Sequence, residues 1–306
     1  MLKYALRRLL MLIPLLLVVS ILIFSMIHMM PGDPAEVIAG EGAQPEDIEN
    51  VRRSLGLDRP LHEQYIAWAS KALRGDFGTS IRTGRPVSTE IGFRFLNTIR
   101  LSVISIVIAT IIGLTSGIIS ATRRYSIYDN ATMVIALIGI SITPFYLGLM
   151  LMLFFSVRLG WFPLMGLESW TGIVLPALTL AARPLAMIAR MTRSSMLEVM
   201  GQDYILTARA QGLPERVIIF KHALRNAMNT VITVIGVQFG HQLGGAVITE
   251  TVFALPGIGR LAVESIKARD FPTVQAAILV VAASFVIINL LVDLLYAYVN
   301  PRIRYS

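Results

Sequence analysis

The chain has 306 residues, of which 55% are hydrophobic and 15% charged, and its mean hydropathy is +0.68. A soluble domain carries about 25% charged residues, so this composition argues against an ordinary water-soluble enzyme and against a disordered chain. With 0 cysteines there is no disulfide framework, thiolate nucleophile or cysteine metal site. In so apolar a chain, a net charge of +8 indicates cytoplasmic loops of a membrane protein rather than nucleic-acid binding.

Six stretches are apolar enough to cross a membrane, which takes about 20 residues per helix. The first is too long for a signal peptide and has no small-residue cleavage site before Pro31-Gly32, so we predict a retained anchor. The fourth contains Pro176 and Pro184, which neighbouring helices can accommodate. The predicted spans are 9–30, 97–121, 131–157, 172–189, 228–249 and 274–299.

Basic residues predict the orientation of these spans. Lys and Arg concentrate in the N-terminal tail, in the loops after the second and fourth spans and at the C-terminus, which places these segments in the cytoplasm. Trp161, Phe162 and Trp170 lie where an outer aromatic belt is expected. We therefore predict an all-α polytopic membrane protein with six transmembrane helices, cytoplasmic N- and C-termini and a small folded external region.

Residues 31–96 form this external region. Apolar residues recur at helical spacing from Leu61 to Ala72, directly after Pro60, and the glycines of residues 75–78 end that helix. The region is either a small cap on the helix ends or a docking surface for an external partner. The predicted organisation is a tail and first span in 1–30, the external region in 31–96, and a five-helix membrane domain in 97–306.

A helix, a tight turn and a second helix are predicted within the cytoplasmic loop 194–226. Residues 202–211 form the first helix, Gly212 suits the left-handed position that ends it, and Pro214 suits the first turn of the next helix. Glu215 follows where the helix dipole favours negative charge. With Leu213 at its tip, and with Tyr204 and Ile205 behind it, this segment either enters a groove on another protein or is an ordinary loop.

Glycines recur at helical spacing in two spans. Gly236, Gly240 and Gly244 lie on one face of the fifth span, and Gly113 and Gly117 repeat the spacing in the second. Small residues so placed let membrane helices approach closely. Packing inside the chain is the favoured interpretation, and a seam with another subunit is the alternative.

No catalytic or metal-binding constellation is present in the sequence. The four histidines include no H-E-x-x-H pair, and no G-x-S-x-G elbow occurs. No lysine follows a glycine, as a phosphate-binding loop requires, so the chain carries no Walker-type ATPase. We expect no metal or cofactor in this chain, and any nucleotide that drives it would lie on a partner.

Polar residues inside the predicted spans mark a candidate translocation pathway, because such residues are costly in a bilayer. These candidates are Gln238, His241, Gln242, Asn289 and Asp293. Asp293 leaves two alternatives open. It could form a structural pair with an arginine such as Arg183, or it could be the proton carrier of an ion-coupled secondary transporter.

Residues 204–213 read YILTARAQGL, and residues 222–227 read HALRNA. These strings resemble the EAA loop, E-A-A-x3-G-x9-I-x-L-P, of ABC-transporter permeases, in the form T-A-R-A-x-G-L…H-x-L-R-N-A of the peptide/nickel branch. Gly212, Ala208 and Leu224 keep the general pattern, and four positions depart from it as this branch does. Those four positions are Leu206, Thr207, His222 and Arg225.

Further blocks extend the resemblance over nearly the whole chain. They read MPGDP at 30–34, LGLDRP at 55–60, GDFGTS at 75–80, ETVFALPGIGRL at 250–261 and RDFPTVQ at 269–275. Their joint order is most similar to the first permease subunit of dipeptide or glutathione systems.

This resemblance implies a set of partners in the cytoplasmic (inner) membrane of a bacterium. A second, similar permease would complete the pathway, two ATPase subunits holding ATP and Mg would bind inside, and an extracytoplasmic substrate-binding protein would deliver peptide; nucleic acid has no part. Residues 194–226 would be the coupling loop that docks on an ATPase. The residues it implies for this contact are Tyr204, Thr207, Ala208, Arg209, Ala210, Gly212, Leu213, His222 and Arg225.

The external stretch 250–270 either folds toward the pathway as a gate or is a plain turn. The candidate gate residues are Glu250, Pro256, Gly257, Gly259 and Arg260. Dipeptide, oligopeptide, glutathione and nickel complexes all stay open as substrates, although the chain offers no convincing nickel cage. An ion-coupled transporter is the alternative outside the ABC class.

Overall fold

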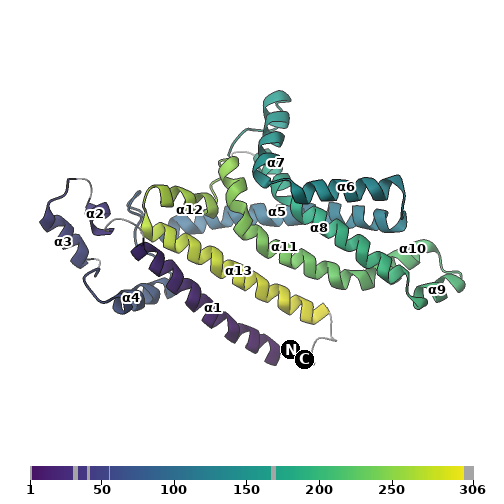
Figure 1. Ribbon diagram of the computed structural model, residues 1–306, viewed down its shortest axis with the longest axis horizontal. Coiled ribbons are helices and arrows are strands. Elements are labelled where there is room, and N and C mark those ends of the chain that lie inside the picture. Colours follow the sequence, from purple (N-terminus) through teal and green to yellow (C-terminus); the bar gives the residue numbers. More distant parts are fainter. Residues whose placement is uncertain (1, 30–33, 40–41, 55, 167–169, 300–306) are drawn as a thin grey trace. The chain divides into compact units, whose positions relative to one another are not determined.

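The computed structural model describes residues 2–29, 34–39, 42–54, 56–166 and 170–299, and this part is helical apart from its connections (Figure 1). Its only β-type pairing is an isolated antiparallel bridge between Thr79 and Pro86. In chain order the helices are α1 Leu2–Met29, α2 Pro34–Ala39, α3 Pro45–Ser54, α4 Leu61–Leu73, α5 Val87–Thr122, α6 Ile127–Ser141, α7 Pro144–Leu151, the π-helix η1 Met152–Arg158, the 3-10 helix η2 Trp170–Ile173, α8 Val174–Met200, α9 Asp203–Ala210, α10 Glu215–Val217, the π-helix η3 Ile218–Ala223, α11 Leu224–Val252, α12 Ile258–Lys267 and α13 Phe271–Val299.

Within the described residues, three single helices are long and apolar enough to cross a membrane. They are Val87–Thr122, Trp170–Met200 and Phe271–Val292. Two bent helix pairs raise the number to five if each pair is one span, and the apolar part of α1, Leu10–Met26, is a shorter candidate. The fourth predicted span, 172–189, lies in a helix that passes Pro184 unbroken and continues to Met200.

The third predicted span, 131–157, is not one continuous helix. α6 ends at Ser141, and α7 begins at Pro144 after a bend of 108°. Proline has no backbone N–H and disfavours helix at the residue before it. Thr143 instead caps α7, because its hydroxyl accepts a hydrogen bond from the N–H of Tyr146 at 3.4 Å. The single helix expected over 131–157 is thus two helices joined at a bend, and the Thr143-Pro144 pair is the local signal for this break.

The chain divides into two compact units, and the first consists mainly of residues 99–255 and 285–299. In it α8 packs between α6 and α11 (Figure 1). Two apolar clusters fill the contacts of α8, one around Leu175 and Phe253 and one around Ile188 and Val231. α8 is therefore the central helix of this unit.

Glycines bring α5 and α8 into direct backbone contact. A Cβ added at Gly117 would lie 2.6 Å from the Cβ of Thr192, and one added at Gly113 would lie 2.9 Å from Cγ2 of Ile188. On α11, the side chain of Val292 likewise occupies the space in which a Cβ of residue 236 would lie, so Gly236 is also closely packed. These close approaches agree with packing inside the chain.

The second unit consists mainly of residues 7–98 and 256–284. α12 packs Ile258 and Leu261 against Val87 and Ile91 at the start of α5. α4 occupies the stretch in which the sequence predicts a helix after Pro60. In this unit, α12 therefore shares an apolar core with the beginnings of α5 and α13.

Candidate functional site

The turn of the predicted coupling loop is set by Gly212. It adopts a φ of +75° between α9 and α10, a left-handed conformation that favours a residue without Cβ. Its N–H donates to the carbonyl of Arg209 at 3.0 Å, which closes the end of α9. Pro214 stands immediately before α10, and Glu215 opens that helix.

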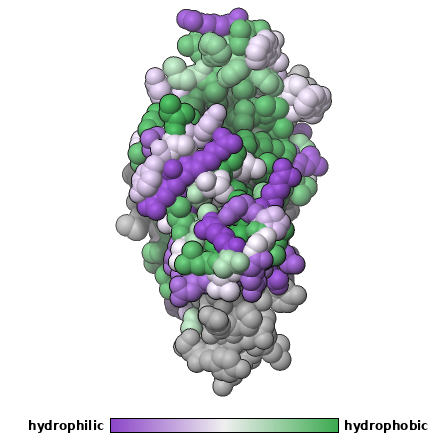
Figure 2. Space-filling model, turned by 90° about the vertical axis from the view of Figure 1, so that its right-hand side faces the viewer, coloured by the Kyte–Doolittle hydropathy of each residue, from purple (hydrophilic) through white to green (hydrophobic). Residues whose placement is uncertain are grey.

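Buried apolar side chains anchor this loop. Ile205 is fully buried and Ala208 is 7% exposed, and both pack with Met196 of α8 and with Ile218. Figure 2 looks onto the side of the molecule where α9 and α10 lie in Figure 1, and hydrophilic and hydrophobic side chains alternate on its surface. The loop therefore joins an apolar base to a mixed surface.

Most of the predicted coupling residues lie on that surface. Tyr204, Thr207, Arg209, Ala210, Gly212, Leu213 and Arg225 are exposed, His222 is half-buried and Ala208 is buried. Nε of Arg209 donates to Oε1 of Glu215 at 2.8 Å, across the Gly212 turn. The Tyr204 hydroxyl accepts from Nδ2 of Asn226 at 2.8 Å. These two contacts fasten α9 to α10 and to the start of α11.

The loop enters α11 through the π-helix η3. Ile218 and Ala223, at its two ends, are fully buried in the cluster that holds Ile205. π-helical turns are rare and occur frequently at functional sites. The sequence pattern gave no indication of this irregularity.

A buried ion pair at the base of the loop was missed by sequence reasoning. The carboxylate of Asp129 on α6 accepts from Nε and Nη2 of Arg193 on α8, at 2.6 and 2.8 Å, and from the Ser120 hydroxyl on α5. Asp129 is 1% exposed, and the bidentate geometry is the strong form of this pair. The available signal is Ser126-x-x-Asp129, a helix-start pattern in which Ser126 accepts from the N–H of Asp129.

The pathway candidates divide into two groups. Gln242 is 4% exposed and donates to the Ser105 hydroxyl at 2.8 Å and to the Leu180 carbonyl at 3.4 Å, which ties α11 to α5 and α8. Its own oxygen has no partner among the described residues. Gln242 is thus a buried polar link between helices.

The second group borders α13. His241 is exposed and lies 5.9 Å from the ring of Phe285, and Asn289 donates to the Phe285 carbonyl at 3.0 Å. A Cβ added at Gly240 would lie 3.3 Å from Oδ1 of Asn289, whereas one at Gly244 would meet nothing within 4 Å. Gln238 is half-buried, and the side chain of Asp293 lies outside the described residues, so its pairing with Arg183 stays untested.

The candidate gate includes the start of a helix rather than a free turn. The Pro256 carbonyl accepts from Nδ2 of Asn97 at 3.0 Å, and the N–H of Ile258 donates to the Thr98 hydroxyl at 3.0 Å. Gly257 and Gly259 are buried at the beginning of α12. Glu250, near the end of α11, is 1% exposed.

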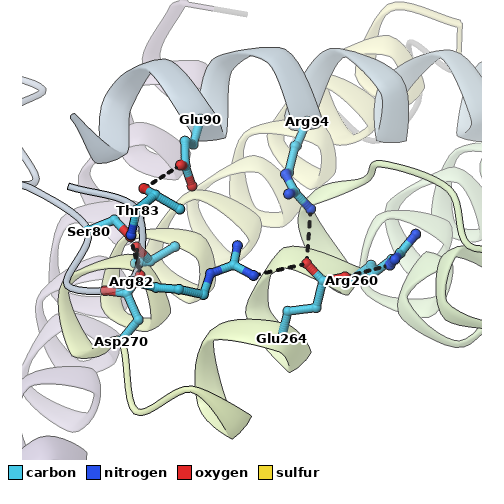
Figure 3. A network of polar contacts seen from close by, with 9 residues as sticks. Ser80, Arg82, Thr83, Glu90, Arg94, Arg260, Glu264 and Asp270 are labelled. Atoms are coloured by element: carbon cyan, nitrogen blue, oxygen red, sulfur yellow. Dashed lines mark hydrogen bonds and ion pairs between the residues drawn. The ribbon is translucent and has the colours of Figure 1, made fainter. Parts of the chain in front are cut away.

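Two carboxylates that the sequence did not single out organise the polar contacts in Figure 3. Glu264 of α12 receives three guanidinium groups, from Arg260 at 2.7 Å, Arg94 at 3.4 Å and Arg82 at 3.9 Å. One carboxylate thus links Arg82, which precedes α5, with α5 and α12.

Asp270 makes a second such contact. It accepts from the Ser80 hydroxyl at 2.5 Å (Figure 3), and from the N–H of Ile81 at 3.1 Å and the Thr273 hydroxyl at 2.8 Å. Because Asp270 is 1% exposed, these bonds fix residues 80–81 to the start of α13.

Comparison with known families identifies the chain's class. Residues 112–305 match the family described as binding-protein-dependent transport system inner membrane component, and residues 1–111 match its N-terminal part. The chain belongs to this family. It is the membrane permease of a transporter, and its relatives are permease subunits rather than enzymes.

Two relatives are similar to this permease over its full length and over theirs. The glutathione transport system permease protein GsiC of Escherichia coli strain K12 is 50% identical over 306 residues, 100% of both chains, and that of Shigella boydii serotype 4 is 49% identical over the same length. The resemblance to permeases of the peptide/nickel branch of ABC transporters is thereby confirmed.

A solved structure shares the fold of the permease. A chain of the MetNI methionine ABC transporter, in an inward-facing conformation, matches with a TM-score of 0.57 and 24% identity. The match covers 69% of the permease and 96% of that chain. At this identity the likeness concerns the fold alone, and it agrees with the helical membrane-transporter architecture.

Proposed function

We propose that this permease forms half of a translocation pathway for short peptides, including glutathione, across the cytoplasmic membrane of a bacterium. The full-length identity of 50% to a glutathione transport permease carries the proposal. A second, similar permease subunit would form the other half. An extracytoplasmic binding protein would deliver the peptide and do most of the selecting.

In the proposed topology the permease crosses the membrane six times with both termini in the cytoplasm. The spans would be α1, α5, the bent pair from α6 to η1, α8, α11 and α13. The concentration of Lys and Arg in the inner loops and tails supports this orientation. Residues 31–96 would form the external region, between the first span in 1–30 and the five-helix domain in 97–306.

Energy would reach the pathway through the coupling loop. Two partner ATPase subunits would hold ATP and Mg, and one would dock on the exposed residues around Arg209, Gly212 and Leu213. Ile205 is buried against Met196 of α8, so a force on the loop would act directly on the central helix. ATP can shift the permease between inward-open and outward-open states only if the ATPase binds these states unequally.

Substrate would pass the α11–α13 side of the first unit. His241 is exposed there, with Gln238 and Asn289 half-buried beside it, so these residues are better placed to meet a peptide than the buried Gln242. The external gate would be the stretch 250–270, which contains α12 and the candidate residues Glu250, Pro256, Gly257, Gly259 and Arg260. Ala254, which has a φ of +52°, would be its hinge because the chain leaves the helical conformation there.

Reconstituted transport tests the proposed function. The permease is purified with its partner permease and both ATPases, placed in proteoliposomes and supplied with the binding protein and radiolabelled glutathione or a dipeptide. We expect uptake that requires both ATP and the binding protein.

The permease alone, under a pH gradient without ATP, is the control. An ion-coupled transporter that used Asp293 would accumulate peptide in this control, and that result would overturn the proposal. A nickel-complex importer of the same branch would instead take up labelled nickel in this assay.

A further inference from the structure

The connection from α5 to α6, residues 123–130, is called here the α5–α6 turn, and it carries arginines stacked on tyrosine rings. Cζ of Arg124 lies 4.5 Å from the ring centre of Tyr125, and Cζ of Arg123 lies 5.1 Å from that of Tyr128. Tyr125 is 74% and Tyr128 is 57% exposed, and both arginines are exposed. The turn therefore offers two cations and two aromatic rings to whatever surrounds it.

The backbone of the α5–α6 turn is held from the inside of the first unit. Tyr125 adopts a left-handed φ of +60°, and its N–H donates to Oδ2 of Asp129 at 3.0 Å. Ser126 caps α6 by accepting from the N–H of Asp129 at 3.2 Å, and the Asp129 carboxylate also holds Arg193 of α8. The stacked arginines are thus mounted on a fixed support.

The exposed positive charge of this turn is not neutralised by the described chain. Asp129, the only carboxylate of the turn, is 1% exposed and already paired with Arg193. Neither Arg123 nor Arg124 forms an ion pair in the part of the chain that the structure describes. Arg124 gives one donor to the Tyr125 hydroxyl at 2.6 Å, and stacking leaves the other N–H groups along the guanidinium edge available, where they suit phosphate oxygens.

An exposed apolar side of α6 ends at this turn. Successive residues of a helix are rotated by about 100°, so Ile127, Val134 and Ile138 share one side of α6. They are 82%, 54% and 50% exposed, whereas Asp129 and Ala136, on the opposite side, are 1% and 4% exposed. The arginines therefore stand at the end of an apolar helix surface, where the hydrocarbon of a bilayer gives way to headgroups.

α8 continues past the level of the α5–α6 turn toward the coupling loop. Arg193 is level with Asp129 because their side chains are hydrogen-bonded, and α8 runs on from Arg193 to Met200, about 10 Å at 1.5 Å per residue. α9 and α10 follow at this end of the unit (Figure 1). A protein that docks on the tip of the loop meets it farther out than the turn, so headgroups fit the turn better than an ATPase does.

We propose that Arg123 and Arg124 bind the headgroup phosphate of a phospholipid with net negative charge in the cytoplasmic leaflet. The proposal rests on the topology of the proposed function, in which α5 and α6 cross the membrane with this turn inside. Tyrosine is enriched at the membrane–water interface, and basic residues are attracted to an anionic leaflet. Charge complementarity favours an anionic lipid over a zwitterionic one, because the latter carries its own cation beside the phosphate.

Fluorescence quenching by brominated lipids tests this site, and the chain suits it because it has 0 cysteines. Ile127→Cys carries a fluorophore beside the turn, and Ile138→Cys carries it on the same side of α6, about 16 Å away. Each labelled permease is assembled with its cysteine-free partner permease and ATPases in vesicles of equal parts phosphatidylglycerol and phosphatidylcholine. Bromine is placed on the acyl chains, near the headgroup, of only one of the two lipids at a time.

We expect brominated phosphatidylglycerol to quench the label at 127 more than brominated phosphatidylcholine does, and both to quench the label at 138 equally. The preference should be about fivefold for each arginine, which corresponds to about 1 kcal/mol per basic residue at an anionic membrane surface. Arg123→Gln/Arg124→Gln should abolish it, and each single substitution should reduce it. Arg216→Gln, which removes an exposed arginine from α10 instead, should leave it unchanged.

Two results would overturn the proposal. Equal quenching of the label at 127 by both lipids would show that the turn does not select anionic lipid. Absence of quenching at 127 by either lipid would show that a protein, such as the ATPase, covers the turn. The single substitutions keep the test decisive if the double variant fails to assemble.

The quenching is measured without any uptake of peptide. A complex that selects phosphatidylglycerol at 127 but transports no peptide would contradict the proposed function and leave this lipid site intact. A complex that transports peptide without this selection would contradict the lipid site and leave the proposed function intact.

Discussion

Two ion pairs, one at the base of the coupling loop and one at its tip, differ in burial. At the base, Asp129 is 1% exposed and accepts two hydrogen bonds from Arg193, whose side chain is 23% exposed. At the tip, Arg209 and Glu215 make one contact, with side chains 37% and 59% exposed. A buried pair cannot lose one partner without leaving a charge in the interior, whereas an exposed pair can exchange its partner for another protein. The base pair therefore stabilises the helix arrangement, whereas the tip pair can be broken without leaving a charge in the interior.

The largest loss of stability is expected when the ion pair at the base loses its Asp129 charge. Asp129→Ala leaves the guanidinium of Arg193, whose side chain is 23% exposed, without its carboxylate. Breaking a fully buried pair costs about 3–5 kcal/mol, so we expect a loss near or below the lower end of that range. Thermal unfolding of the purified complex in detergent measures the loss. The double variant Asp129→Leu/Arg193→Met, which removes both charges, should recover most of it. An equally unstable double variant would show that the pair is not the source.

Adding a methyl group in the close contact between α5 and α8 should cause the next largest loss of stability. Gly117→Ala places a methyl group 2.6 Å from the Cβ of Thr192, and overpacking of this kind costs about 1–3 kcal/mol. Gly244→Ala is the matched control in another span, because a Cβ there meets nothing within 4 Å. We expect a lower melting temperature for the first variant only. Equal melting temperatures would contradict the close contact of α5 with α8.

At the tip, Gly212→Ala is expected to affect transport more than folding. A left-handed conformation costs a residue with a Cβ about 1–2 kcal/mol, and no neighbouring atom is crowded at this position. Gly201→Ala is the control, because Gly201 has a φ of −85°. ATP-dependent uptake should fall in Gly212→Ala and further in Gly212→Pro, with membrane insertion unchanged. Uptake equal to that of the control would mean that the shape of the turn does not matter for coupling.

The smallest change in stability is expected for Arg209→Glu, since exposed ion pairs contribute about 0.2–1 kcal/mol. Uptake should nevertheless be lost if Arg209 meets the ATPase. The exchange Arg209→Glu/Glu215→Arg restores the pair within the loop but presents reversed charges to the partner. We expect this exchange to remain inactive. Recovery of uptake would show that the pair only holds α9 to α10.

Local signals in the sequence predicted much of the helical architecture. Apolar stretches marked the long helices, Pro60 and the glycines after it bounded α4, and Gly212 marked the end of the helix before the turn. Each of these features depends on residues a few positions apart, so no distant contact is needed to specify it. The family resemblance rested in the same way on short ordered blocks.

Contacts between distant residues were not predicted. Asp129 and Arg193 are separated by 64 positions, and Ser80 and Asp270 by 190, and nothing in their local patterns marks them as partners. Nothing in the sequence distinguishes Glu264 from the other acidic residues, whereas the structure places three arginines around it. The glycine spacing of the fifth span could not show which glycines are packed against another helix. The side chain of Val292 occupies the space beside Gly236, whereas no atom lies within 4 Å of a Cβ added at Gly244.

The sequence by itself determined that this protein is an apolar, helical permease with a glycine-closed turn in the predicted coupling loop. Hydropathy, glycine conformation and ordered motifs are properties of short segments, and they hold in any arrangement of the chain. Only the tertiary structure decided which charges are buried together, which glycines are packed and which side of α6 stays exposed. Burial and pairing depend on neighbours that the fold brings together from distant positions, and these neighbours are what separate the rigid base of the loop from its exposed tip.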